Sequence, residues 1–180
     1  MTNSRKRTHG DASPDQITGW FAGRIPDGWF VGAPQVTSDR DEILVVGRIA
    51  EPELPGEASA DTAGAAIASR IAGYREDTRA KRMQIADEAQ HRFSRTVSWG
   101  VECADQRVLF TTLSVPAMTR LRMPERHVLD TLVDAGVARS RSHALAWCVR
   151  LVAERQDDWL EDLREALTKV QEVRSEGPRD

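Results

Sequence analysis

Hydrophobic positions divide the first two thirds of the chain into strand-like and helix-like stretches. Residues 29–36 and 43–49 are rich in apolar residues and are joined by the polar run S-D-R-D-E, which predicts two strands. Further along, T-V-S-W-G-V-E-C and R-V-L-F-T-T-L-S-V flank an A-D-Q turn and predict two more strands.

The segment between these strand pairs has the period of a helix. From Ala60 to about Arg95, apolar residues return every three or four positions, and Ser59 stands where a helix N-cap is expected. Gly64 and Gly73 weaken the first half, so a break near Gly73 is expected. Residues 15–116 therefore predict an α+β domain of order β-β-α-β-β, with an antiparallel sheet and one long helix on one face.

The polar residues 1–14, which include the basic cluster S-R-K-R, predict a disordered tail. A nucleic-acid-binding arm is the alternative interpretation of that cluster.

A different pattern begins at residue 117 and extends to residue 174. Residues 118–123 can form one short strand, and Pro124 suits the first turn of a helix that ends at Gly136. Ser140 opens a second helix with the run A-L-A-W-C-V-R-L-V, which is apolar nearly all round. A third helix is expected from about Asp158, with one apolar side formed by Trp159, Leu163, Leu167 and Val170.

Two aromatic pairs, Trp20–Phe21 and Trp29–Phe30, lie within repeated G-W-F-x-G stretches. Such residues can stack on bases or line a ligand pocket, but in a small sheet they more often fill the core. We therefore expect them in the core of the N-terminal domain.

Composition narrows the class of protein. Hydrophobic residues make up 40% of the chain and charged residues 29%, which is ordinary for a globular protein. No apolar run approaches the roughly 20 residues of a membrane span, and the N-terminus lacks an apolar signal core, so a cytoplasmic protein without membrane contact is expected. Cys103 and Cys148 lack paired spacing and are expected to be core residues rather than disulfide or zinc ligands.

Catalysis finds little support in the sequence. The four histidines, His9, His91, His127 and His143, have no carboxylates at metal-ligand spacing, and no phosphate loop or nucleophile elbow occurs. We therefore expect no enzyme, cofactor or metal.

The basic residues of the long helix are Arg75, Arg79, Lys81, Arg82, Arg92 and Arg95. They alternate with acidic residues, which is typical of a solvated helix face. Binding of RNA or of an acidic partner is the alternative.

The arginines just before the two C-terminal helices form the strongest candidate site. In an extended strand, Arg120 and Arg122 point to one face and Leu121 to the other. A lone strand cannot satisfy its own edges, so two copies are expected to pair as an antiparallel ribbon that fits the DNA major groove, where arginine can bind guanine. Residues 118–142 hold five arginines against three acidic residues, a local patch on a chain of net charge −3.

Strand, helix, glycine and then S-R-S-x-A opening a second helix resembles the ribbon-helix-helix family of DNA-binding dimers. The resemblance covers about a fifth of the chain and implies an obligate homodimer. The base-contacting residues that it implies are Arg120, Arg122 and Met118, and the phosphate-contacting residues are Arg139, Ser140, Arg141 and Ser142. The sequence departs from the family at Met123, where a Ser or Asp cap is common, and at His143, where Glu is common. The family also usually carries this module at the N-terminus.

The expected function is therefore a homodimeric, sequence-specific DNA-binding transcriptional regulator, most simply a repressor. One alternative is a non-enzymatic scaffold whose C-terminal module only dimerises while the N-terminal domain binds a protein or RNA. Another is an antitoxin. The other interpretation of Arg120 and Arg122 is the solvated face of an edge strand, where charges block aggregation. The sequence does not distinguish a dimer from a tetramer.

Overall fold

The computed structural model describes residues 12–54, 56 and 58–176. The chain divides into two compact units, with the boundary along the sequence between Pro116 and Ala117. Most of the expected disordered tail, residues 1–11, lies outside the described residues. Its last residues are ordered: Ala12 packs against the core and Ser13 caps the first helix.

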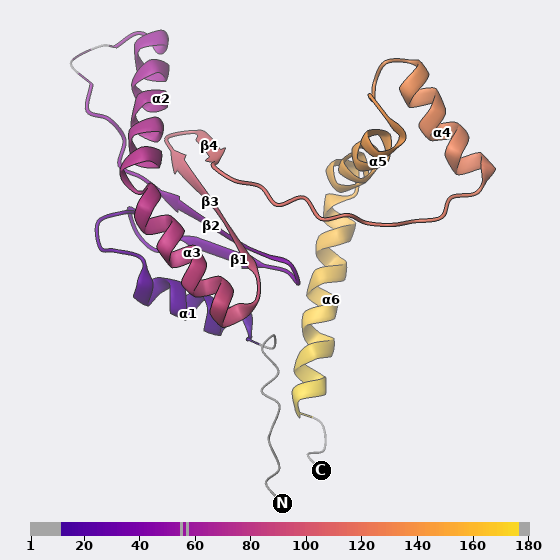
Figure 1. Ribbon diagram of the computed structural model, residues 1–180, viewed down its shortest axis with the longest axis horizontal. Helices are drawn as coiled ribbons and strands as arrows, with labels where there is room; N and C mark the ends of the chain where they lie inside the picture. The colour runs from indigo at the N-terminus through magenta and orange to yellow at the C-terminus, as the bar shows by residue number, and fades with distance from the viewer. Residues whose placement is uncertain (1–11, 55, 57, 177–180) are drawn as a thin grey trace, which may run out of the picture. The chain divides into compact units, whose positions relative to one another are not determined.

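The N-terminal unit contains a four-stranded sheet in the order β1-β2-β3-β4 (Figure 1). The strands are β1 (Gln35–Ser38), β2 (Glu42–Arg48), β3 (Thr96–Cys103) and β4 (Gln106–Leu109). Two hairpins, β1–β2 and β3–β4, are antiparallel, but β2 and β3 run parallel, with Glu42 opposite Thr96. The expected antiparallel sheet is therefore wrong. Helices connect β2 to β3 and return the chain to the edge where β2 began, which is the connection that parallel neighbours require.

Three helices accompany this sheet, not one: α1 (Pro14–Arg24), α2 (Ala60–Asp77) and α3 (Arg79–Phe93). Helix α1 begins with a capping box between Ser13 and Gln16, which offsets the low helix propensity of its two glycines. The expected long helix is broken at Thr78, which ends α2 and precedes α3, rather than at Gly73.

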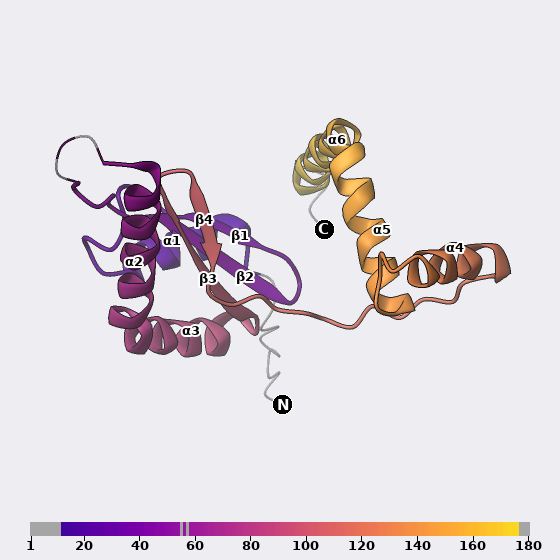
Figure 2. The same cartoon turned by 90° about the horizontal axis from the view of Figure 1, so that it is seen from above.

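The helices cover one face of the sheet (Figures 1 and 2). Alternate residues of β3 lie in the core: Val97, Trp99, Val101 and Cys103. They share this core with buried residues of all three helices. The expected core role of the aromatic pairs is confirmed: Phe21 is fully buried, while Trp20, Trp29 and Phe30 pack against the core. The Phe30 ring lies directly over Gly47, where no Cβ would fit.

The C-terminal unit consists of α4 (Met123–Asp134), α5 (Arg141–Arg155) and α6 (Asp157–Glu176). Its described residues form no strand, so the strand expected over residues 118–123 is wrong, and with it the ribbon-helix-helix fold. The chain is α+β, with an N-terminal helix and a four-stranded mixed sheet carrying two further helices, followed by a three-helix region.

Candidate functional site

The segment before α4 carries the residues expected to contact bases. It is extended but unpaired, and Met118 is 99% exposed. Leu121 packs against the core of the C-terminal unit, and its carbonyl oxygen accepts a hydrogen bond from Arg126 Nη1 at 2.8 Å. That carbonyl is thus satisfied by a side chain instead of a neighbouring strand. Arg120 and Arg122, on either side of Leu121, remain exposed and have no ion-pair partner among the described residues.

The turn between α4 and α5 places the expected phosphate-contacting residues together. Gly136 has φ of +73°, a conformation that suits glycine, and reverses the chain after α4. Ser140 is the N-cap of α5 as expected: its hydroxyl oxygen accepts a hydrogen bond from the His143 backbone N–H at 3.3 Å. Arg139 and Ser142 are exposed on either side of this cap.

Arg141 differs from its neighbours because its guanidinium is already bound. Nε and Nη2 donate to the two carboxylate oxygens of Asp130 at 2.6 and 2.8 Å. This hydrogen bonding holds the pKa of the Asp130 carboxyl below its usual range and raises the pKa of Arg141. A phosphate would therefore compete with Asp130 for this edge of the guanidinium.

The residues expected to read bases and those expected to bind phosphate thus lie on two separate stretches, one before α4 and one before α5. A core of three buried residues, Leu129, Ala138 and Ala144, lies between α4 and α5. This core is small for three helices.

Helix α6 presents an apolar face to solvent, as its sequence pattern predicts. Trp159, Leu163, Leu167 and Val170 recur at helical spacing and are between 42% and 61% exposed. No residue of α6 with a described side chain is buried. An exposed apolar stripe of this length is typical of an interaction surface.

One basic residue of the N-terminal unit is placed differently from the sequence expectation. Arg82 is only 7% exposed, so the expected solvated helix face is wrong at this position. The signal was its spacing: Arg82 falls three residues before Ile85 and seven before Ala89, on the buried stripe of α3.

Neither a metal centre nor a membrane span is found in the part of the chain that the structure describes. Its His, Cys, Asp and Glu residues form no group of three that could hold a metal ion. None of its helices combines the length and the apolar character needed to cross a membrane.

Comparisons with known proteins match both units. Residues 15–109 match the family described as "Rv1265-like protein, N-terminal domain", and residues 122–174 match "Mb1296 C-terminal domain". The resemblance to the ribbon-helix-helix family is therefore wrong, because the C-terminal unit matches a different family domain and forms no ribbon strand.

Similar proteins include "Uncharacterized protein Mb1296" of Mycobacterium bovis and "Uncharacterized protein Rv1265" of Mycobacterium tuberculosis. Each is 55% identical over 159 residues, which cover 88% of this chain and 69% of the relative. No solved structure matches. The N-terminal match covers more than half of the sequence and the relatives align over both units, so the chain belongs to the Rv1265-like family.

Proposed function

We propose that the chain is a homodimeric, sequence-specific DNA-binding regulator of transcription, most simply a repressor, that contacts DNA through its C-terminal unit. The observation that carries this proposal is the combination of exposed arginines with an uncovered apolar helix face in one small unit. The apolar face supports self-association, and the arginines support binding to a nucleic acid.

Association of two copies follows from the poor burial within the C-terminal unit. Its three helices bury only three residues among those described, while Val149, Val152 and the apolar stripe of α6 stay exposed. Burial of apolar surface is the main term that stabilises a small domain, and few residues supply it here. A second copy offers the same face, which an isologous contact can cover.

The charge around α4 supports DNA binding. The stretch 118–142 carries five arginines and three acidic residues, although the whole chain has a net charge of −3. One such patch is weak, whereas a dimer presents two and can match a DNA site of twofold symmetry. Arg120 and Arg122 are the proposed base readers, because they are exposed and free of carboxylates among the described residues.

The test begins with selection of preferred duplexes from a random pool by the purified chain. Fluorescence anisotropy then compares the selected duplex, the DNA upstream of the chain's own gene and a scrambled duplex across a salt series. We expect the variant Arg120→Ala/Arg122→Ala to lose roughly tenfold or more of the preference for the selected duplex, since each bidentate base contact is worth about 1–3 kcal/mol.

The matched control is Arg40→Ala/Arg70→Ala, which removes two exposed arginines from the N-terminal unit and should leave the preference unchanged. If no duplex is enriched, or if weak binding to all duplexes survives in the Arg120/Arg122 variant, the proposal fails. The C-terminal unit would then serve only for association, and a scaffold role for the N-terminal unit would be favoured.

A further inference from the structure

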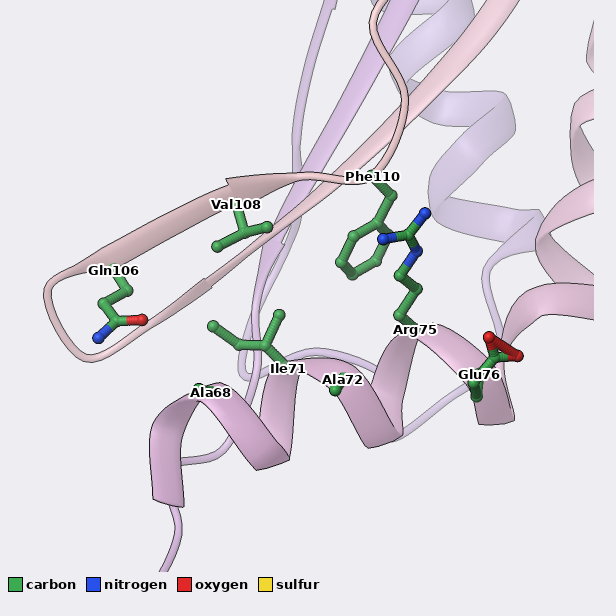
Figure 3. Close-up of a pocket in the computed structure, with 8 residues that line it drawn as sticks. All are labelled: Ala68, Ile71, Ala72, Arg75, Glu76, Gln106, Val108 and Phe110. Carbon is green, nitrogen blue, oxygen red and sulfur yellow. The ribbon is translucent and has the colours of Figure 1, made fainter. Parts of the chain in front are cut away.

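The N-terminal unit has an open hollow of about 420 Å³ between α2 and β4. Ala68, Ile71 and Ala72 form one face of α2, and Val108 of β4 points toward Ile71 across the gap (Figure 3). Alanines at positions 68 and 72 leave room that larger side chains would fill. This end of the hollow is mainly aliphatic, and Gln106 of β4 adds one polar side chain to the lining (Figure 3).

A second hollow, of about 330 Å³, adjoins the first because both are lined by Arg75, Glu76 and Phe110. It adds two arginines, Arg79 and Arg82. We call the two together the α2–β4 groove. The groove has an aliphatic end and a cationic end, where three arginines outnumber the single carboxylate.

Arg82 is the buried part of the cationic end. Its Nε donates to Thr78 Oγ1 at 3.0 Å and its Nη2 donates to the Arg75 carbonyl at 2.7 Å, so it satisfies the last turn of α2. Its guanidinium also lies 4.8 Å from the centre of the Phe110 ring.

These contacts leave Arg82 without a close ion pair to any described residue, and Glu76 attracts its charge only from a longer distance. No carboxylate lies within ion-pairing distance of Arg82 among the residues that the structure describes, and burial lowers the pKa of its guanidinium. A buried charge without a close ion pair has a free-energy cost, and an anion in the adjoining hollow would lower that cost.

We propose that the α2–β4 groove binds a small amphipathic carboxylate. The aliphatic tail lies between Ile71 and Val108, and the carboxylate faces the arginines at the other end. This inference goes beyond the proposed function and does not depend on it.

Two features favour a carboxylate with an aliphatic tail over a nucleotide. Glu76 lines both hollows and repels a doubly charged phosphate more strongly than a single carboxylate. Phe110, the one aromatic residue that lines the groove, already has the guanidinium groups of Arg82 and Arg75 over its ring, at 4.8 and 5.7 Å. A base that stacks on a face covered by one of these groups would have to displace it.

The experiment titrates the isotope-labelled full chain with decanoate, below its micelle threshold, and follows backbone amide shifts by NMR. Decanol tests the tail without the charge, and acetate tests the charge without the tail. We expect saturable shifts at residues of the groove with decanoate, and binding at least about tenfold weaker with either partial ligand.

Variants locate the two ends of the groove. Arg75→Gln and Arg79→Gln should each weaken decanoate binding several-fold, and Ala72→Phe should abolish it by filling the aliphatic end. Arg40→Gln, an equal loss of charge at an exposed position that lines neither hollow, should have no effect. Arg82 is left unchanged because its hydrogen bonds hold the end of α2, and a thermal melt checks that each variant is folded.

The proposal is overturned if decanoate gives no saturable shifts, or if decanol binds as tightly as decanoate. Unchanged binding in folded Ala72→Phe would also overturn it. So would shifts in the groove with AMP and none with decanoate, because the groove would then be a nucleotide site.

Discussion

At the start of α5, the guanidinium of Arg141 is bound along one edge by Asp130 of α4. If the proposed function holds, Asp130 limits DNA affinity, because it occupies donors that a phosphate could use and adds a negative charge beside the patch. We predict that Asp130→Asn raises affinity for all duplexes by roughly three- to tenfold and steepens the salt dependence by about one phosphate contact, measured by anisotropy.

Asp134→Asn is the matched control, since it removes the same charge four residues later, at an exposed position that forms no ion pair with any residue that the structure describes. Equal gains in both variants would mean that only net charge matters and that Arg141 makes no phosphate contact. The pair between Asp130 and Arg141 also depends on pH. Because the folded-state pKa of Asp130 is depressed, the pair with Arg141 is retained through the usual carboxylate range and is lost only as pH falls through that lowered pKa.

Residue-level features could be predicted where a local rule decides them. Ser140 caps α5 because a side-chain oxygen before a helix can accept a backbone N–H, and this rule is visible in the sequence. The expected exposure of Arg82 is wrong because it weighs the charge of this residue above its spacing. Arg82 lies eleven residues after Ile71 and three before Ile85, so helical periodicity puts it on the buried stripe, while Met83, one residue later, is 58% exposed.

Among the elements, α1 combines a capping box with a sequence of low helix propensity. It contains Gly19 and Gly23, so its intrinsic helix propensity is low, and Ser13 with Gln16 satisfies its first backbone N–H groups. We predict that Ser13→Ala lowers the free energy of unfolding of the N-terminal unit by about 1 kcal/mol, seen as a lower urea midpoint with an unchanged slope.

The control for this prediction is Ser69→Ala, at an exposed position within α2. Alanine has the higher helix propensity there, so stability should not fall. If Ser13→Ala has no more effect than Ser69→Ala, the packing of Ile17 and Phe21 holds α1 in place without the capping box.

Strands β2 and β3 and the caps Ser59 and Ser140 follow from their own residues. The strand expected over residues 29–36 is wrong over most of its length, because it overlaps β1 only at Gln35 and Val36.

Two features of the arrangement also do not follow from the local sequence. The capping signal S-P-D-Q precedes α1, yet its glycines and aromatic pair resemble a bend, and only burial of Ile17 and Phe21 against the sheet decides for a helix. Likewise, nothing within β2 or β3 states that they are parallel. That follows from helices α2 and α3 returning the chain across the sheet face.

On the scale of the whole molecule, the two units differ in the size of their buried cores. The N-terminal unit has a cluster of fourteen buried residues that joins three helices to the sheet, whereas the C-terminal unit has a cluster of three. This contrast supports the proposal that the chain associates with itself through its C-terminal unit. The α2–β4 groove lies in the N-terminal unit, which has the large buried core. The proposal for the groove is therefore independent of the proposal for the C-terminal unit.

The test of this assignment uses two neighbouring positions of α6. Leu167 belongs to the exposed apolar stripe and Thr168 lies on the opposite, polar side, so Leu167→Glu and Thr168→Glu add the same charge to different faces. We predict a mass of twice 20.1 kDa for the unmodified chain and for Thr168→Glu, measured by light scattering. Leu167→Glu should have the mass of one chain, because a carboxylate in an apolar interface loses its hydration without gaining a partner.

A single-chain mass for the unmodified protein would contradict the dimer. A dimer that survives Leu167→Glu would place the contact elsewhere than on the α6 stripe.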